Sequence, residues 1–269
     1  MELSRKSIEL TKEEKVALIT GATSGIGEAF ARRFAKEGYN LIITGRRKEK
    51  INSLASELKE KFHISVDVFI VELSNTDNVE FLIEKIKNRN INVLVNNAGF
   101  ATKNTFANSN LNVQEQMVNL HVICAMKLIY SILPNMIKQN NGEIINLSSQ
   151  SAFFSMPKNA TYSGTKAFLK VFSESLYLET MELGVKVQVL CPGFVISDFH
   201  QKMGSSKANN QNKGIIRWMK PEKVVDISLN ALKKDKLICK PGFFENLGMN
   251  ILRLLPKRIY YKIACNFGK

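Results

Sequence analysis

The sequence predicts an α/β fold: a doubly wound parallel sheet of about seven strands, with helices on both faces, in a single domain. Three observations lead to this prediction. Short apolar, β-branched runs alternate with longer helical patterns along the chain. The runs are apolar throughout, which is typical of parallel strands that are buried on both faces. A chain of 269 residues that is 45% hydrophobic can also bury one large core.

The expected elements follow one another in regular alternation. Strands are expected at residues 15–20, 40–45, 65–71, 91–96, 142–148, 186–191 and 236–240. Helical patterns lie at residues 26–37, 47–61, 76–89, 112–139, 160–183 and 221–234. Right-handed crossovers then place helices on both faces of the sheet. Because such sheets bind ligands beyond the carboxyl ends of their strands, functional residues are expected at that edge.

The chain divides into a leader, a central domain and a tail. Residues 1–13 are charged and lack the continuous apolar core of a secretory signal. Residues 14–240 hold all the expected strands. Within them, residues 192–220 form a connection of a length that is usually functional in a compact domain. Residues 241–269 mix apolar and basic side chains, as basic amphipathic helices do.

Composition limits the partners of the protein. The net charge is +14, but the basic residues are spread along the chain without a nucleic-acid motif, so no nucleic-acid partner is expected. The four cysteines, at positions 124, 191, 239 and 265, are far apart, and no histidine pair lies near them. We therefore expect neither a metal site nor disulfides, and we expect a cytoplasmic location. No uncharged apolar run reaches the roughly 18 residues of a spanning helix. The tail is left with three alternatives: peripheral membrane contact, closure over a substrate pocket, or packing on a neighbouring subunit.

The motif TGATSGIG at residues 20–27 follows the first expected strand and opens the first helix. Gly21, Gly25 and Gly27 allow a tight turn, a close approach of a pyrophosphate and close packing of the helix. The helix amino terminus also offers free N–H groups to phosphate. We therefore predict a Rossmann-type dinucleotide site at this turn. The other residues of the turn expected to contact the dinucleotide are Thr23, Ser24 and Ile26.

The second strand ends in ITGRRKEK, which contains Arg46 and Arg47 and no acid at the strand end. An acidic residue at this point binds the ribose 2′-hydroxyl of NAD(H), whereas an arginine favours the 2′-phosphate of NADP(H). A doubly basic corner without a carboxylate predicts NADP(H) as the preferred cofactor, with NAD(H) as the alternative.

Tyr162 and Lys166 stand four residues apart in a helical pattern, so they share a helix face. A nearby ammonium stabilises a phenolate and is expected to lower the pKa of Tyr162 from about 10 toward the working range. Such a phenol can act as the general acid or base of a hydride transfer between a nicotinamide and a carbonyl. Taken alone, the pair fits an ordinary surface contact equally well.

The ordered set of motifs resembles the short-chain dehydrogenase/reductase family over roughly residues 14–240. The motifs are TGATSGIG, NNAG at 96–99, Asn119, INLSSQS at 145–151, YSGTK at 162–166 and PGFVISDF at 192–199. The resemblance implies that this region is a catalytic domain with a tetrad of Asn, Ser, Tyr and Lys. The matching residues are Asn119, Ser149, Tyr162 and Lys166. Ser149 is chosen over Ser148 because the serine of the family stands thirteen positions before the tyrosine, and 162 − 13 = 149.

The resemblance also implies roles for these groups. Ser149 would stabilise charge on the substrate oxygen, Lys166 would hold the nicotinamide ribose, and Asn119 would position a water that links Lys166 to solvent. Asn97 and Gly99 would line the adenosine half of the cofactor site, and Val195 and Ser197 would lie by the carboxamide. Further cofactor contacts are expected from Tyr162, Lys166, Glu72, Leu73, Ala98, Pro192 and Gly193.

Three positions depart from the family pattern. Glu72 stands where the family commonly has aspartate, and Ser197 stands where it has threonine. Ser24 occupies a position where many NADP-preferring members carry Lys or Arg.

The functional prediction is an NADP(H)-dependent oxidoreductase, a carbonyl reductase that acts on a carbonyl/alcohol substrate of medium, largely apolar character. Aromatic and methionine side chains in residues 150–159 and 192–220 are expected to contact this substrate. One alternative is an NAD-linked alcohol or hydroxysteroid dehydrogenase, and another is a non-catalytic dinucleotide-binding scaffold. By resemblance, residues 112–139 and 160–183 form the subunit contact of a homodimer or homotetramer.

Overall fold

The computed structural model describes residues 14–199, 217–242 and 255–267. The leader, residues 200–216 of the expected substrate loop and part of the tail lie outside the described residues. Seven parallel strands form one sheet in the order β3-β2-β1-β4-β5-β6-β7. The strands are β1 (Val16–Ile19), β2 (Asn40–Gly45), β3 (Val66–Ile70), β4 (Val93–Asn96), β5 (Gly142–Leu147), β6 (Val185–Leu190) and β7 (Ile238–Cys239).

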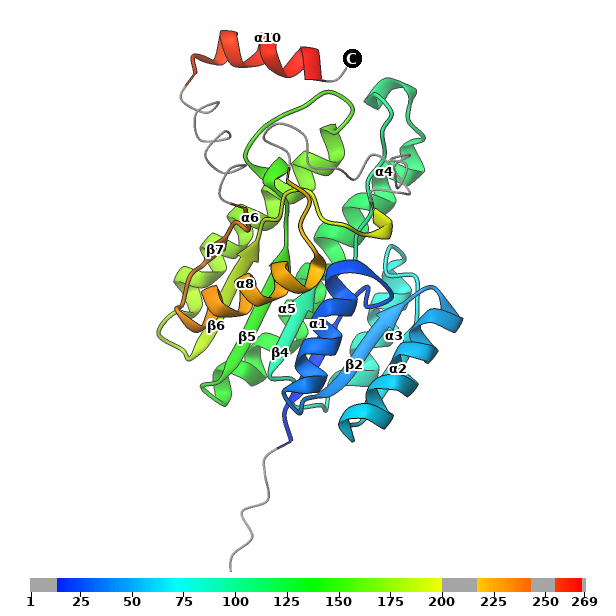
Figure 1. Ribbon diagram of the computed structural model, residues 1–269. Coiled ribbons are helices and arrows are strands. Elements are labelled where there is room, and N and C mark those ends of the chain that lie inside the picture. Colours follow the sequence, from blue (N-terminus) through cyan, green and yellow to red (C-terminus); the bar gives the residue numbers. More distant parts are fainter. Residues whose placement is uncertain (1–13, 200–216, 243–254, 268–269) are drawn as a thin grey trace, which may run out of the picture.

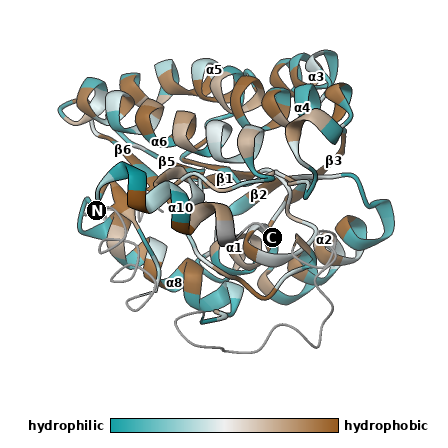
Figure 2. Cartoon of the chain, turned by 90° about the horizontal axis from the view of Figure 1, so that it is seen from above, coloured by the Kyte–Doolittle hydropathy of each residue, from teal (hydrophilic) through white to brown (hydrophobic). Residues whose placement is uncertain are grey.

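Helices cover both faces of the sheet, so the predicted doubly wound α/β fold is confirmed. The α-helices are α1 (Gly25–Lys36), α2 (Lys48–Phe62), α3 (Thr76–Ile86), α4 (Leu111–Val118), α5 (Cys124–Lys138), α6 (Ala160–Thr180), α8 (Pro221–Lys233) and α10 (Lys257–Phe267). Seen along the strands, α1, α2 and α8 lie on one side of the sheet and α3, α4, α5 and α6 lie on the other (Figure 2). Short 3-10 helices form at η1 (Phe106–Asn108) and η3 (Gln150–Ala152).

The core consists of two apolar layers, one on each face of the sheet. Phe30 and Phe34 of α1 are buried in the layer beneath α1, α2 and α8. Leu82 of α3 and Leu128 of α5 are fully buried in the opposite layer. Each such side chain contributes about 1.5–3 kcal/mol through burial. These layers fix the strand ends, and with them the positions of the residues that follow each strand.

The long helix expected at 112–139 contains a π-helical turn. α4 ends at Val118, a π-helical turn η2 (Asn119–Ile123) follows, and α5 begins at Cys124. The backbone N–H of Cys124 donates to the carbonyl of Asn119, five residues earlier, which gives the wider turn. Such π-turns are frequent at functional sites. The expected helix is present as the continuous helical stretch Leu111–Lys138, but the π-turn within it was not predicted, because the apolar spacing is the same on both sides of the turn.

By length and apolar composition alone, Leu111–Lys138 is one helical stretch of the described chain that could cross a membrane. Half of its apolar window is buried inside the domain. The helix α5 packs against α3 and β5. These are the contacts of a core helix.

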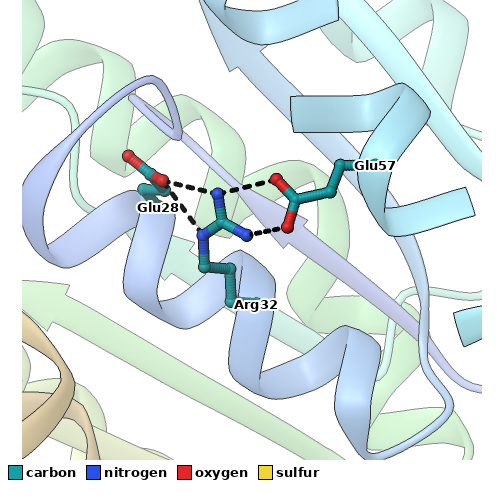
Figure 3. A network of polar contacts seen from close by, with 3 residues as sticks. All are labelled: Glu28, Arg32 and Glu57. Atoms are coloured by element: carbon teal, nitrogen blue, oxygen red, sulfur yellow. Dashed lines mark hydrogen bonds and ion pairs between the residues drawn. The ribbon is translucent and has the colours of Figure 1, made fainter. Parts of the chain in front are cut away.

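A network of charged side chains joins α1 to α2 (Figure 3). Arg32 donates to Glu28 of its own helix at 2.9 and 3.0 Å and to Glu57 of α2 at 2.5 and 3.0 Å. The three side chains are partly exposed, so each pair contributes about 1 kcal/mol at most. The network holds the two helices that begin near the glycine turn and the end of β2.

The last helix, α10, lies above the carboxyl ends of the strands (Figures 1 and 2). The hydroxyl of Tyr260 accepts a hydrogen bond from the Ser155 N–H at 2.6 Å and donates to the Ser155 carbonyl at 2.7 Å. Ser155 belongs to the segment between β5 and α6. The tail therefore contacts the edge of the sheet at which the functional residues are expected.

Candidate active site

The glycine turn after β1 has the geometry that a dinucleotide site requires. Gly21 and Gly25 have φ angles of +69° and +61°, which side chains rarely allow. A Cβ atom on Gly21 would lie 2.9 Å from the Cα of Ala98, and one on Gly27 would lie 2.3 Å from Nδ2 of Asn97. The residues present therefore fit a cradle in which the backbone approaches a phosphate group closely.

Asn97 and Ala98 hold this turn in place. Nδ2 of Asn97 donates to the carbonyls of Thr20 and Gly21 at 2.8 and 3.1 Å. Oγ1 of Thr20 accepts from the backbone N–H groups of Asn97 and Ala98 at 2.9 and 3.0 Å. Thr20 was not predicted as a site residue, although its place as the first residue of TGATSGIG is a usable signal.

Ser149, Tyr162 and Lys166 come together between the end of β5 and the first turns of α6. Ser149 lies two residues after the end of β5 and is the N-cap of η3, where its hydroxyl accepts from the Ser151 N–H at 3.1 Å. The Ser149 hydroxyl also hydrogen-bonds the Tyr162 side chain. Nζ of Lys166 lies 5.7 Å from the centre of the Tyr162 ring and donates to the Leu147 carbonyl at 2.8 Å.

Ser148 and Asn119, both within the described part of the chain, do not hydrogen-bond the Tyr162 hydroxyl. The Ser148 hydroxyl is buried and donates to the backbone carbonyl of Lys166 at 2.7 Å, so Ser148 holds α6 and not the Tyr162 hydroxyl. Asn119 opens the π-helical turn η2, which packs against α6. Among the described residues, no hydrogen bond links its side chain to Ser149, Tyr162 or Lys166.

Burial opposes the charged forms of both catalytic candidates. It raises the pKa of Tyr162 to about 12, although the Ser149 hydrogen bond lowers it in part. Burial lowers the pKa of Lys166 to about 7. The expected lowering of the Tyr162 pKa by Lys166 is not found, because the lysine nitrogen lies over the ring and donates to Leu147 instead. The nearby Cys191 thiol is also buried, which raises its pKa to about 12.

His121 links the segment after β4 to the first turn of α6. Its Nε2 accepts from the Phe100 N–H at 3.2 Å, which assigns the proton of the neutral ring to Nδ1. Nδ1 lies 2.9 Å from Oγ1 of Thr165, and that hydroxyl donates to the Tyr162 carbonyl at 2.9 Å. The imidazole also packs edge-on against the Tyr162 ring, with the ring centres 5.9 Å apart.

Burial holds the pKa of His121 well below its ordinary value of 6.5. Gly99 lies directly against this ring, since a Cβ there would be 2.8 Å from Nε2 of His121. Sequence reasoning missed His121, because it treated the three histidines only as candidate metal ligands. A single histidine in an apolar helix gives no local sign of these partners.

The corner after β2 contains carboxylates that the local sequence does not show. Nη1 of Arg46 pairs with Oε2 of Glu72 at 2.7 Å, and Nη1 of Arg47 pairs with Oδ2 of Asp198 at 2.5 Å. Burial alone would raise the pKa of Glu72, but hydrogen bonds from Arg46 and Ser74 outweigh burial and lower it. The Arg47 hydrogen bond lowers the pKa of Asp198. The prediction of a carboxylate-free corner was wrong, because strand ends distant in sequence meet at this edge.

The segment after β6 crosses the top of the site. Val195 pairs with Met219 in an isolated bridge, and the carbonyl of Pro192 accepts from the Gln150 N–H at 3.1 Å. Ser197 lies against the glycine turn, since a Cβ on Gly25 would be 2.9 Å from the Cβ of Ser197. Ile26 and Leu73 bury their side chains in the core, so only their backbones can face a cofactor.

Of the aromatic and methionine side chains expected to contact the substrate, those in residues 150–159 and Phe199, Trp218 and Met219 are described. The Phe199 ring lies 6.0 Å from that of Tyr162, and Trp218 lies 5.3 Å from Phe194. Met203 lies outside the described residues.

Comparisons with known proteins agree with this geometry. A family model described as short chain dehydrogenase matches residues 15–208. The very-long-chain 3-oxoacyl-CoA reductase of Homo sapiens is 29% identical over 257 residues, which cover 94% of this chain and 79% of that protein. The hydroxysteroid dehydrogenase-like protein 1 of Gallus gallus is 34% identical over 184 residues, 67% of this chain but only 55% of that protein.

Solved structures show the same fold. A short-chain dehydrogenase from Sphingobium yanoikuyae in complex with NADPH has a TM-score of 0.79 at 24% identity, over 90% of this chain and 96% of its own. A 7beta-hydroxysteroid dehydrogenase has a TM-score of 0.83, also at 24% identity, over 93% of this chain and 96% of its own.

The fold and the comparisons together define an oxidoreductase that acts on CH–OH donors with NAD(P) as acceptor. The chain belongs to the short-chain dehydrogenase/reductase family.

Proposed function

We propose that this chain reduces an apolar carbonyl compound with NADP(H), with Tyr162 as the proton donor. The observation that carries the proposal is the placement of Ser149, Tyr162 and the buried Lys166 together, with Nζ of Lys166 5.7 Å from the centre of the Tyr162 ring. These groups lie at the same edge of the sheet as the glycine turn. When bound, the reduced nicotinamide supplies the hydride, and the side chains of this chain supply orientation and the proton.

Each side chain has a separate task in this proposal. Ser149 holds the substrate oxygen and stabilises its developing charge, as an oxyanion donor does. Tyr162 donates its proton to that oxygen. Burial raises the pKa of Tyr162 to about 12, so the phenol carries the proton that this step requires at neutral pH. Lys166 and the water-positioning Asn119 then resupply the proton from solvent.

The preference for NADP(H) over NAD(H) rests on the charge of the corner after β2. Arg46, Arg47 and Lys50 carry three positive charges there, and Glu72 and Asp198 carry two negative charges, so the sum is 3 − 2 = +1. The remaining positive charge favours a 2′-phosphate. The NADPH in the Sphingobium yanoikuyae enzyme supports this choice through the fold alone.

For the substrate, we favour a carbonyl compound with an apolar body. Phe199 lies beside Tyr162, and the relatives include proteins named for hydroxysteroids and for very-long-chain 3-oxoacyl-CoA. Nearby basic groups could meet an anionic handle such as that of coenzyme A. Lys240 and Lys170, which lie 4.5 and 5.5 Å from the centre of the Phe153 ring, are candidates.

A substrate panel tests the proposed function. Purified protein is assayed for NADPH oxidation with simple ketones, aldehydes, quinones, oxosteroids and 3-oxoacyl thioesters. Turnover of at least one apolar carbonyl with NADPH is expected. Turnover only as NAD-linked alcohol oxidation would favour the dehydrogenase alternative. Tight dinucleotide binding with no turnover in either direction would favour the scaffold.

We also propose a homodimer formed through α5 and α6. Tyr130 of α5 is 84% exposed, and Val171 and Leu178 of α6 are 58% and 70% exposed. Such large apolar groups on adjacent helices support a subunit contact.

Three alternatives were left open for the tail. The bonds between Tyr260 and Ser155 favour the one in which the tail closes over the substrate side. Peripheral membrane contact and a cytoplasmic location stay predictions.

A further inference from the structure

The guanidinium of Arg47 is held by three side chains. Its Nη2 donates to Oγ1 of Thr23 at 2.8 Å and to Oγ of Ser24 at 2.7 Å. Its Nη1 pairs with Oδ2 of Asp198 at 2.5 Å. Ser24 is the N-cap of α1, and its hydroxyl is engaged by Arg47 and not by the helix backbone. Arg47 is thus fixed beside the glycine turn.

Asp198 reaches this position from a distant part of the chain. It lies 151 residues after Arg47, in the segment that follows β6. The neighbouring Ser197 is in close contact with Gly25, so the segment after β6 packs against the glycine turn. A groove of about 770 Å³ beside the turn is lined by Ser24, Lys50 and Asp198, and its other charged residues are Arg32 and the carboxylates of Glu28, Glu49, Glu57 and Glu222.

A carboxylate and a phosphate use the same face of an arginine. The planar guanidinium fork binds either anion through paired N–H groups. Arg47 stands at the end of β2, where a cation reads the 2′-phosphate of NADP(H). The Asp198 carboxylate therefore occupies a donor of Arg47 that a 2′-phosphate would use. It also places a negative charge next to that phosphate.

We propose that Asp198 competes with the 2′-phosphate for Arg47, and so lowers the affinity for NADP(H) and its discrimination from NAD(H). The inference rests on the proposed NADP(H) function. Binding of the phosphate moves the carboxylate off Arg47. Lys50, whose Nζ lies 3.6 Å from Oδ2 of Asp198, remains as the cation that keeps the carboxylate at the rim of the groove.

A purely structural role for the pair predicts a different result. If Asp198 only held Ser197 against the glycine turn, its loss would weaken both dinucleotides by the same factor. Because NADPH and NADH differ only in the 2′-phosphate, the ratio of their affinities separates competition from positioning.

The test is calorimetric titration of the full-length protein with NADPH and with NADH. In Asp198→Asn, NADPH should bind about five- to tenfold more tightly while NADH changes by less than about twofold, as expected for loss of a partly exposed competing charge. Asp198→Glu keeps the charge and should keep the affinity ratio of the unchanged protein. The gain in Asp198→Asn should shrink as salt rises, because screening weakens the interaction.

Asp226→Asn is the matched control. Asp226 of α8 pairs with Arg33 of α1, so this variant also removes an aspartate charge from an arginine partner. It does so away from Arg47. This control should leave both affinities unchanged. An unchanged ratio in Asp198→Asn, or equal weakening of both dinucleotides, would overturn the inference and leave the proposed function standing. Failure of the unchanged protein to bind either dinucleotide would overturn both.

Discussion

His121 and Thr165 are joined through Nδ1 and Oγ1 at 2.9 Å, in the same turn of α6 that carries Tyr162. The bond connects the π-helical turn to the catalytic candidate, because Thr165 in turn donates to the Tyr162 carbonyl. The chain of bonds requires a neutral imidazole, since Nε2 must accept from the Phe100 N–H. A second proton, on Nε2, would break the bond from the Phe100 N–H while Nδ1–H could still donate to Thr165.

The first prediction concerns stability against acid. The pKa of His121 is below 6.5 in the folded protein, so the unfolded chain binds a proton that the folded chain does not as the pH falls below about 6.5. Stability should therefore fall with decreasing pH, by up to about 1.4 kcal/mol per pH unit from this group alone. Above the unfolded pKa, the group contributes no pH dependence.

Urea denaturation between about pH 7.5 and about pH 5 measures this slope. His121→Asn should be less stable than the unchanged protein at neutral pH but should show a shallower loss in acid. His63→Asn, on the exposed side chain that ends α2, serves as the control and should retain the full slope. An identical slope in His121→Asn and the unchanged protein would contradict the account of His121.

The second prediction concerns Gly99. A methyl group there would meet Nε2 of His121 at 2.8 Å, so Gly99→Ala should destabilise the fold by about 1–3 kcal/mol. Gly164→Ala on α6 is the opposite case, since no atom lies within 4 Å of its Cβ position. That variant should be more stable by about 0.5–1 kcal/mol, from helix propensity. Free energies of unfolding measure both effects. If Gly99→Ala were as stable as Gly164→Ala, the His121 ring would have to move aside at no cost in stability.

The third prediction concerns Arg46. Its side chain is 56% exposed and paired with Glu72, so it can turn to a 2′-phosphate at little cost. Arg46→Ala should weaken the binding of NADPH about tenfold or more and change the binding of NADH by less than about twofold. The reason is that Arg46 makes its charged hydrogen bond to the 2′-phosphate, which NADH lacks. Arg89→Ala removes a comparable exposed pair with Asp67 and should change neither. Parallel losses for both cofactors in Arg46→Ala would remove the proposed role.

The fourth prediction separates two adjacent serines. Ser149→Ala should lower kcat about 10²–10³-fold, as loss of an oxyanion donor does, and should also cost about 1 kcal/mol of stability through loss of the cap on η3. Ser148→Ala removes a buried bond to the Lys166 carbonyl, so it should cost about 1 kcal/mol of stability and affect turnover less. Steady-state kinetics and denaturation of the two variants compare them directly. The reverse pattern would assign the substrate oxygen to Ser148.

The sequence was sufficient for features that depend on local patterns. Each predicted strand is present, because a continuous apolar run such as 40–45 has few other ways to be buried. The family spacing selected Ser149 over Ser148, whose hydroxyl donates to the Lys166 carbonyl; the catalytic role of Ser149 stays a prediction. The π-helical turn at Asn119 was missed, since α4 and α5 share one apolar periodicity.

Contacts between distant segments could not be predicted in the same way. The pairing of Arg47 with Asp198 and that of His121 with Thr165 depend on which strand and helix ends meet at one edge of the sheet. The pKa of Tyr162 depends on burial and on the direction of the Lys166 side chain. Neither quantity is contained in the spacing of the two residues along the helix.

The central claim is that Tyr162 donates the proton to the substrate oxygen, and Tyr162→Phe tests it most directly. Turnover of the best carbonyl substrate should fall about 10²–10⁴-fold, the usual contribution of a general acid, while the NADPH dissociation constant and the unfolding free energy stay nearly unchanged. Tyr39→Phe, just before β2 and packed on Phe34, at the opposite edge of the sheet, should keep full activity. Near-normal turnover in Tyr162→Phe would contradict the account.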